Sequence, residues 1–157
     1  MSAKYSIDDI TPLARLTNLE TLVIGRSRIS DIRPLSGMTN LTTLYLASSY
    51  ISDITPLARL TQLIHLDISW NEISDISPLA GLTSLTILNL SNNPISDFSY
   101  ISLLANLTHL GLWNSGIDCL TPLADLRFLG YLHLCENLDI DMSPVAHVGY
   151  IGFWRIY

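Results

Sequence analysis

The 157-residue sequence contains almost no lysine, few cysteines and no long apolar run. Its one lysine is Lys4, and a chain with a net charge of −6 lacks the basic stripe that neutralises nucleic-acid phosphates. The two cysteines, Cys119 and Cys135, are too few for a disulfide framework, and neither lies in a metal-type C-x-x-C pair. We therefore expect no nucleic-acid partner and no disulfide framework.

No stretch approaches the ~18 apolar residues of a membrane-spanning helix. The start, MSAKYSIDDITPL, has no basic region followed by an apolar segment of signal-peptide length. As it stands, the sequence predicts a cytoplasmic protein without membrane insertion. A domain excised from a secreted or surface precursor would have the same composition, so the compartment stays open.

Apolar residues make up 48% of the chain and charged residues only 14%. This composition excludes the disordered class and favours one core-rich globular or repeat domain.

A 22-residue period organises nearly the whole chain, which we treat as a single domain, 1–157. Its unit is L-x-x-L-x-x-L-x-L-x-x-(N/S)-x-I-x-D-I-x-P-L-x-x. A half repeat at 6–15 leads in, and a partial terminal repeat at 148–157 ends the chain. The full repeats are 16–37, 38–59, 60–81, 82–103, 104–125 and 126–147.

Each unit predicts one strand and one turn. In L-x-L, as at Leu44-Tyr45-Leu46, alternate side chains lie on opposite faces of a strand, so the leucines point inward. The segment S-D-I-x-P-L offers Ser or Asp to cap a short helical turn and a Pro that presets its backbone. Tyr100, Cys119 and Asp139 depart from this pattern.

An Asn or Ser three residues after the second leucine is expected to satisfy backbone groups inside the turn. A serine hydroxyl bonds fewer backbone groups than an amide does, so the Ser-containing units should be held more weakly. These residues are Ser27, Ser49, Asn71, Asn93, Ser115 and Asn137.

The unit resembles the leucine-rich repeat, in the 22-residue class of bacterial internalins and of a leucine-rich regulator of protein phosphatase 1. The resemblance covers about residues 7–157. It implies an α/β solenoid, a right-handed superhelix with a parallel concave sheet of about seven strands and short helical or irregular turns on the convex side. It also implies a non-enzymatic protein-interaction module without cofactor, which binds a protein partner on the concave sheet. Internalins typically carry a helical cap before the repeats and an immunoglobulin-like domain after them, and we expect neither within these 157 residues.

The outward strand positions carry the functional information, because a solenoid exposes them on its concave face. Aromatic residues, His and charged residues there favour a protein interface. The alternative is that neighbouring aromatics pack across strands for stability alone. The predicted partner-binding residues are Tyr45, His65, Asp67, Trp70, His109, Trp113, Tyr131 and His133.

Three other functions compete with partner binding. The chain could be a structural or assembly segment of a longer solenoid. His65, Asp67 and Ser69 share one strand face and have the residue types of a hydrolytic triad, but no nucleophile turn or oxyanion hole accompanies them. His109, His133, Cys135 and Glu136 have metal-binding chemistry without a ligand-spacing motif. We therefore predict no catalytic residue and no metal site.

The ending HVGYIGFWRIY continues the period. In a 22-residue register, Val148, Ile151, Trp154 and Ile156 occupy inward positions, and Trp154 replaces an inward leucine. Phe153, Arg155 and Tyr157 face out beside them. We expect this unpaired strand edge to be a site of self-association into a homo-oligomer.

Overall fold

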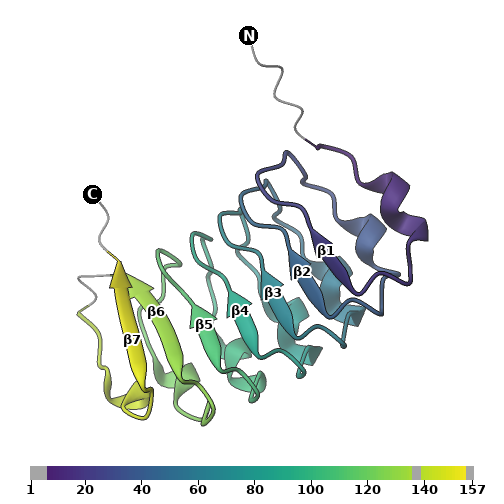
Figure 1. Ribbon diagram of the computed structural model, residues 1–157. Coiled ribbons are helices and arrows are strands. Elements are labelled where there is room, and N and C mark those ends of the chain that lie inside the picture. Colours follow the sequence, from purple (N-terminus) through teal and green to yellow (C-terminus); the bar gives the residue numbers. More distant parts are fainter. Residues whose placement is uncertain (1–6, 136–138, 155–157) are drawn as a thin grey trace.

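The computed structural model describes residues 7–135 and 139–154 as a curved stack of repeats (Figure 1). One seven-stranded sheet holds all strands in chain order, and every neighbouring pair is parallel. The strands are β1 (Thr21–Val23), β2 (Thr43–Tyr45), β3 (His65–Asp67), β4 (Ile87–Asn89), β5 (His109–Gly111), β6 (Tyr131–Cys135) and β7 (Tyr150–Trp154). This confirms the predicted solenoid with a parallel sheet of seven strands.

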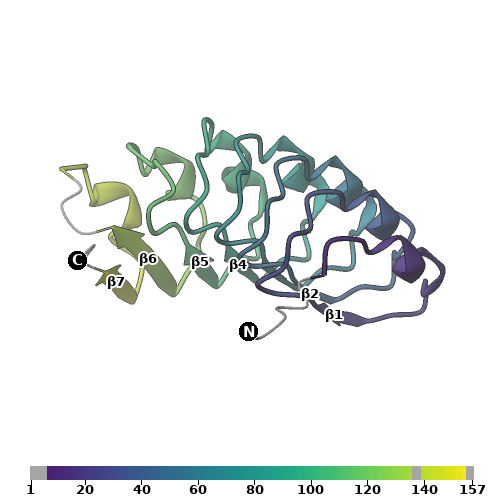
Figure 2. The ribbon, with the colours of Figure 1, turned by 90° about the horizontal axis from the view of Figure 1, so that it is seen from above.

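Short 3₁₀ helices form the opposite side of the solenoid, and the sheet curves away from them so that its outer face is concave (Figure 2). None of the helices among the described residues is long and apolar enough to cross a membrane. The helices are η1 (Thr11–Arg15), η2 (Arg33–Leu35), η3 (Thr55–Arg59), η4 (Ser77–Gly81), η5 (Ser99–Leu103), η6 (Thr121–Leu123) and η7 (Ser143–Val145).

The strand register follows the 22-residue period from β1 to β6. Leu44 pairs with Leu22 on one side and Leu66 on the other, and both Leu44 and Leu66 are at most 1% exposed. Stacking equivalent leucines removes their surface from water, since no single unit covers its own apolar face. The core is therefore one continuous column along the stack.

Six of the seven described convex helices follow an aspartate, which lies one residue before the N-cap and accepts from the N–H of the first helical residue. The backbone N–H of Thr55, the first residue of η3, donates to Asp53 Oδ1 over 2.9 Å. The same bond precedes η5, where Ser99 N–H donates to Asp97 Oδ1 over 2.8 Å, so this helix forms without the proline that Tyr100 replaces. At Cys119 the thiol instead donates to Thr121 Oγ1 over 3.2 Å.

Buried asparagines hold the ends of β3 and β4 to the preceding repeat, as the pattern predicts. The Asn71 amide nitrogen donates to the carbonyls of Leu46, Ile68 and Ser69, and its oxygen accepts from Ile51 N–H. Leu46 and Ile51 belong to the preceding unit, so one side chain joins two repeats.

Asn93 repeats this set of bonds one unit later. The serine at this position does less. The Ser115 hydroxyl donates to one carbonyl, that of Leu112, and Ser27 and Ser49 share one hydroxyl–hydroxyl bond of 2.7 Å. Asn137 lies outside the described residues.

The predicted register of the last unit is wrong. Ile151 pairs with Leu132 and Phe153 with Leu134, so Phe153 occupies an inward column instead of facing out. The Trp154 backbone pairs with that of Cys135, so Trp154 does not replace an inward leucine. Phe153 is nonetheless 48% exposed, because β7 is the last strand of the described sheet.

A shortened connection causes this shift. β6 starts ten residues after the start of η6, whereas β7 starts seven residues after the start of η7. The last unit lacks one L-x-x triplet. Between the convex helix and the strand it has three apolar positions, Val145, Val148 and Ile151, where the preceding unit has four leucines. The residues Arg155, Ile156 and Tyr157 lie outside the described residues, and self-association through this edge stays a prediction.

Replacing Asn71 by alanine should lower the free energy of unfolding by about 3 kcal/mol, because several buried backbone groups lose their partner. Ser115→Ala should cost about 1 kcal/mol, since one bond is lost. Urea unfolding followed by circular dichroism measures both. Equal losses in the two variants would contradict the role given to the amide.

The aspartate caps predict destabilisation in acid. Side-chain and backbone hydrogen bonds from Arg33 lower the pKa of Asp31 from 3.8 to about 2, and bonds from Thr55 lower the pKa of Asp53. A lowered pKa means that the folded state favours the carboxylate, so the stability is present above pH 3.8 and is lost as the pH falls through the lowered value.

The urea midpoint should therefore fall between pH 3.8 and about 2. Asp53→Asn keeps an oxygen that accepts from Thr55 N–H but cannot titrate, so it should reduce the slope of this fall. A slope identical to that of the unmodified chain would contradict the assignment.

Candidate functional site

A hollow of about 500 Å³ lies on the concave face over β4, β5 and β6. It brings together five of the eight predicted partner-binding residues: Trp70, His109, Trp113, Tyr131 and His133. The other lining residues are Ser69, Ile87, Leu88, Asn89, Ser91, Asn92, Leu110 and Gly111. We call this hollow the concave groove.

Gly111 makes room for the concave groove. It stands at an outward position of β5, between Asn89 of β4 and His133 of β6. The Asn89 side chain leans over Gly111, where a Cβ atom would collide with its amide oxygen. A glycine at an outward strand position was the sequence signal for a hollow, and the aromatic pattern alone did not contain it.

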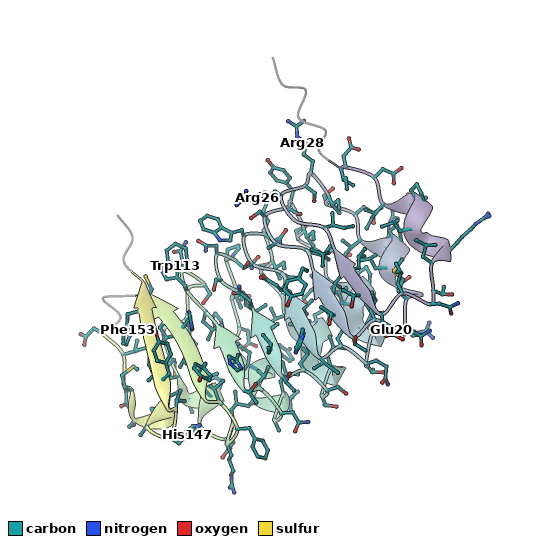
Figure 3. All side chains as sticks on the ribbon, viewed as in Figure 1. Glu20, Arg26, Arg28, Trp113, His147 and Phe153 are labelled. Atoms are coloured by element: carbon teal, nitrogen blue, oxygen red, sulfur yellow. The ribbon has the colours of Figure 1, made fainter. Side chains whose placement is uncertain are left out.

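Two indoles border the groove beyond the carboxyl ends of the strands. The rings of Trp70 and Trp113 lie 5.8 Å apart between centroids, tilted by 46°, although they come from units two repeats apart. Figure 3 shows Trp113 on the same rim of the solenoid as Arg26 and Arg28, which lie nearer the amino-terminal end. We call this edge the carboxyl rim.

Trp70 is held in a backbone conformation that bulky residues avoid. Its φ is 56°, in the left-handed region, and its N–H donates to the carbonyl of Ser91 over 2.9 Å. Such a conformation costs an L-residue roughly 1–2 kcal/mol and is least unfavourable for Gly, Asn and Asp. The turn imposes this φ on the same position of five successive units, namely Arg26, Ser48, Trp70, Asn92 and Asn114.

A second aromatic group borders the groove at the amino ends of the strands. His109 and Tyr131 stack with centroids 4.4 Å apart and planes within 7°. The ring centroid of Tyr150, in β7, lies 5.8 Å from that of Tyr131 and 6.0 Å from that of His133. The 22-residue register does not place Tyr150 here. The sequence signal for the observed register is the pattern Val148-x-x-Ile151-x-Phe153.

The polar residues beside the groove bond mainly to their own strands. Asp67 Oδ1 accepts from both the N–H and the hydroxyl of Ser69, and Asn89 Oδ1 accepts from Ser91 N–H. Asn89 also donates to Asp67 Oδ2 over 3.4 Å. These bonds fix the side chains across β3 and β4.

This arrangement does not support the hydrolytic alternative. The Ser69 hydroxyl donates to Asp67 over 2.6 Å, whereas a triad serine donates to histidine. Ser69 is also only 4% exposed, which keeps its oxygen from a substrate.

The metal alternative gains no support either. Within residues 7–135 and 139–154, no three His, Cys, Asp or Glu side chains gather closely enough to hold an ion. His109 Nδ1 bonds instead to Thr108 Oγ1 over 2.9 Å. Glu136, which the sequence added to this set, lies outside the described residues.

The other three predicted residues lie on the concave face but do not line the groove. Tyr45 is on β2, where it pairs with Asp67 of β3, and His65 begins β3. Their contribution to binding stays a prediction.

Comparison with known proteins gives consistent matches. The family model "Leucine Rich repeats (2 copies)" matches residues 17–59 and 61–102. Internalin C2 of Listeria monocytogenes is 36% identical with a TM-score of 0.87, over 95% of this chain and 67% of that one. Internalin F of the same organism is 31% identical with a TM-score of 0.82, over 97% and 52%. The chain therefore spans about two thirds of the first and half of the second.

A more distant match shows the fold alone. The ectodomain of the receptor kinase GASSHO1/SCHENGEN3 of Arabidopsis thaliana, in complex with Casparian strip integrity factor 2, is 21% identical with a TM-score of 0.75. The match covers 95% of this chain and 19% of the ectodomain. No curated protein matches the sequence.

Trp70→Asn should change the free energy of unfolding by less than about 1 kcal/mol. Relief of the left-handed strain offsets the lost ring contact, which contributes roughly 0.5–1.5 kcal/mol. Trp113→Asn relieves no such strain and should cost about 2 kcal/mol of buried surface. Urea unfolding of both variants provides the measurement, and an equal loss in both would make Trp70 a purely structural residue.

Proposed function

Because the chain belongs to the leucine-rich-repeat family, we propose that it is an interaction module that binds a protein partner in its concave groove. The family fold is generally a non-enzymatic protein-interaction fold, and the matched relatives are of this kind. In the plant receptor, the same fold is in complex with Casparian strip integrity factor 2. The proposal extends these relations to this chain and to one surface of it.

One observation carries the proposal. The groove has exposed aromatic rings on both sides, with Trp70 56%, Tyr131 48% and Tyr150 52% exposed. Trp and Tyr supply large contact areas at low entropic cost and dominate the binding energy of protein interfaces. A hollow with such rings at both edges matches the buried centre of an interface surrounded by a polar rim.

Packing for stability alone explains the rings less well. Cross-strand aromatic pairs contribute roughly 0.2–1 kcal/mol each, which accounts for the stacked His109–Tyr131 pair. It does not account for Trp70, whose position costs about as much as its ring contact contributes. A residue that the fold gains little from is better explained by an external partner.

The matches to two internalins of Listeria monocytogenes support an internalin-like, bacterial protein as the finer form of the proposal. The aromatic groove is a property of this chain's own residues, so it can be tested without that assumption.

Changing Trp113 or Tyr131 to alanine should reduce the recovery of partner proteins by at least about tenfold, as expected for residues at the centre of an interface. The chain is immobilised, incubated with lysates of bacterial and host cells, and the retained proteins are quantified by mass spectrometry. The relevant partners are those whose recovery depends on the groove.

Phe128→Ala is the matched control, because Phe128 is 67% exposed and does not line the groove. Circular dichroism confirms that all three variants fold. If the same proteins are retained equally by the unmodified chain, both groove variants and the control, the concave groove is not the binding surface.

A further inference from the structure

Charge is distributed unevenly along the solenoid. Residues 1–59 hold six basic residues and five acidic ones, a net charge of +1. Residues 60–157 hold two basic residues and nine acidic ones, a net charge of −7. The concave groove lies in the second part, which also contains its entire lining. Some of these acids, such as Asp75, Asp97 and Asp141, lie before convex helices. The charge therefore attracts a positively charged segment to the carboxyl-terminal repeats as a whole rather than to the amino-terminal ones.

The charged side chains beside the groove are also negative, like the net charge of residues 60–157. Ser69, Trp70 and Asn89 line the groove, and Asp67 is hydrogen-bonded to both Ser69 and Asn89. Among the described residues, the one ion pair is that of Arg33 with Asp31, so no arginine or lysine there neutralises Asp67. Glu72, which follows Trp70 by two residues, is exposed.

The cations of the carboxyl rim lie at its other end. Arg26 and Arg28 belong to the first full repeat, two units before Trp70 (Figure 3). At ~4.8 Å per strand, these units are about 10 Å apart along the sheet. A basic segment that follows the rim is repelled at the amino-terminal end and attracted at the groove, which fixes its position.

Trp70 offers a second attraction for a cation. Trp70 is 56% exposed and its backbone is held in the turn, so the residue is presented to solvent from a fixed point of the rim. The face of an indole binds an ammonium or guanidinium group better than any other side-chain ring does. A carboxylate and an indole from the same repeat thus suit one basic side chain.

We propose that the protein partner binds through a basic segment, and that one of its arginine or lysine side chains lies between Asp67 and the indole of Trp70. This inference rests on the proposed function and names the chemistry of its partner. The remaining apolar part of the segment occupies the groove between the two aromatic groups, over Gly111.

The probe is the peptide acetyl-Gly-Arg-Gly-Arg-Gly-amide, compared with the same peptide carrying citrulline, which keeps the shape of arginine but has no charge. Binding is followed by two-dimensional NMR of the tryptophan indole N–H groups at low salt. The arginine peptide should shift the Trp70 signal and bind about fivefold more tightly than the citrulline peptide. Added salt should weaken the arginine peptide alone.

Asp67→Asn should weaken the binding of the arginine peptide about threefold, as expected for a partly exposed charge pair. The amide oxygen still accepts from Ser69, so the strand is kept. Asp75→Asn is the matched control: it makes the same change of charge in the same repeat, at a convex carboxylate that accepts from Ser77 N–H. It should leave binding unchanged.

Several results would overturn the inference. These are equal affinity for the arginine and citrulline peptides, an unshifted Trp70 signal, or equal effects of Asp67→Asn and Asp75→Asn. If any of these occurs while Trp113→Ala still abolishes partner recovery, protein binding in the groove stands and its basic anchor does not.

Discussion

The ends of β3 and β4 depend on a buried asparagine that bonds two repeats at once. Asn71 and Asn93 tie the carbonyls and N–H groups of their own unit to those of the unit before. The chain can then leave the sheet through a left-handed residue, which places that residue on the carboxyl rim. The rim is thus a product of satisfying backbone groups inside the turn, and the side chains displayed there are held by the core beneath them.

The groove forms where one outward side chain is missing from the regular sheet and aromatic side chains gather around the gap. A missing side chain at Gly111 opens the surface, and rings at both ends of the strands enclose it. The repeat itself provides only positions. Because inward leucines already bury the core, the outward positions are free to serve recognition, and a residue as costly as Trp70 is tolerated in a turn that Asn fits better.

Most of the fold could be predicted from the period alone, since a 22-residue spacing of leucines fixes strand, turn and stacking order. Five of eight predicted site residues line the groove, because alternation along a strand assigns faces reliably. Asn89 and Ser91 were outward in the pattern, but only packing around Gly111 shows that they border a hollow. Tyr150 could be predicted only from the correct register of β7. That register depends on the length of the convex connection before β7, which the 22-residue period does not give.

The triplet omitted before β7 shifts the register of this strand by three residues relative to the 22-residue period. Three is an odd number and faces alternate every residue, so removing three residues moves Phe153 from an outward to an inward register position. Tyr150 and Gly152 thereby take the concave positions in register with Tyr131 and His133. The length of a segment on the convex side thus decides which residues face the concave side. A deletion there changes the side chains that the concave surface presents, without any substitution in the strand itself.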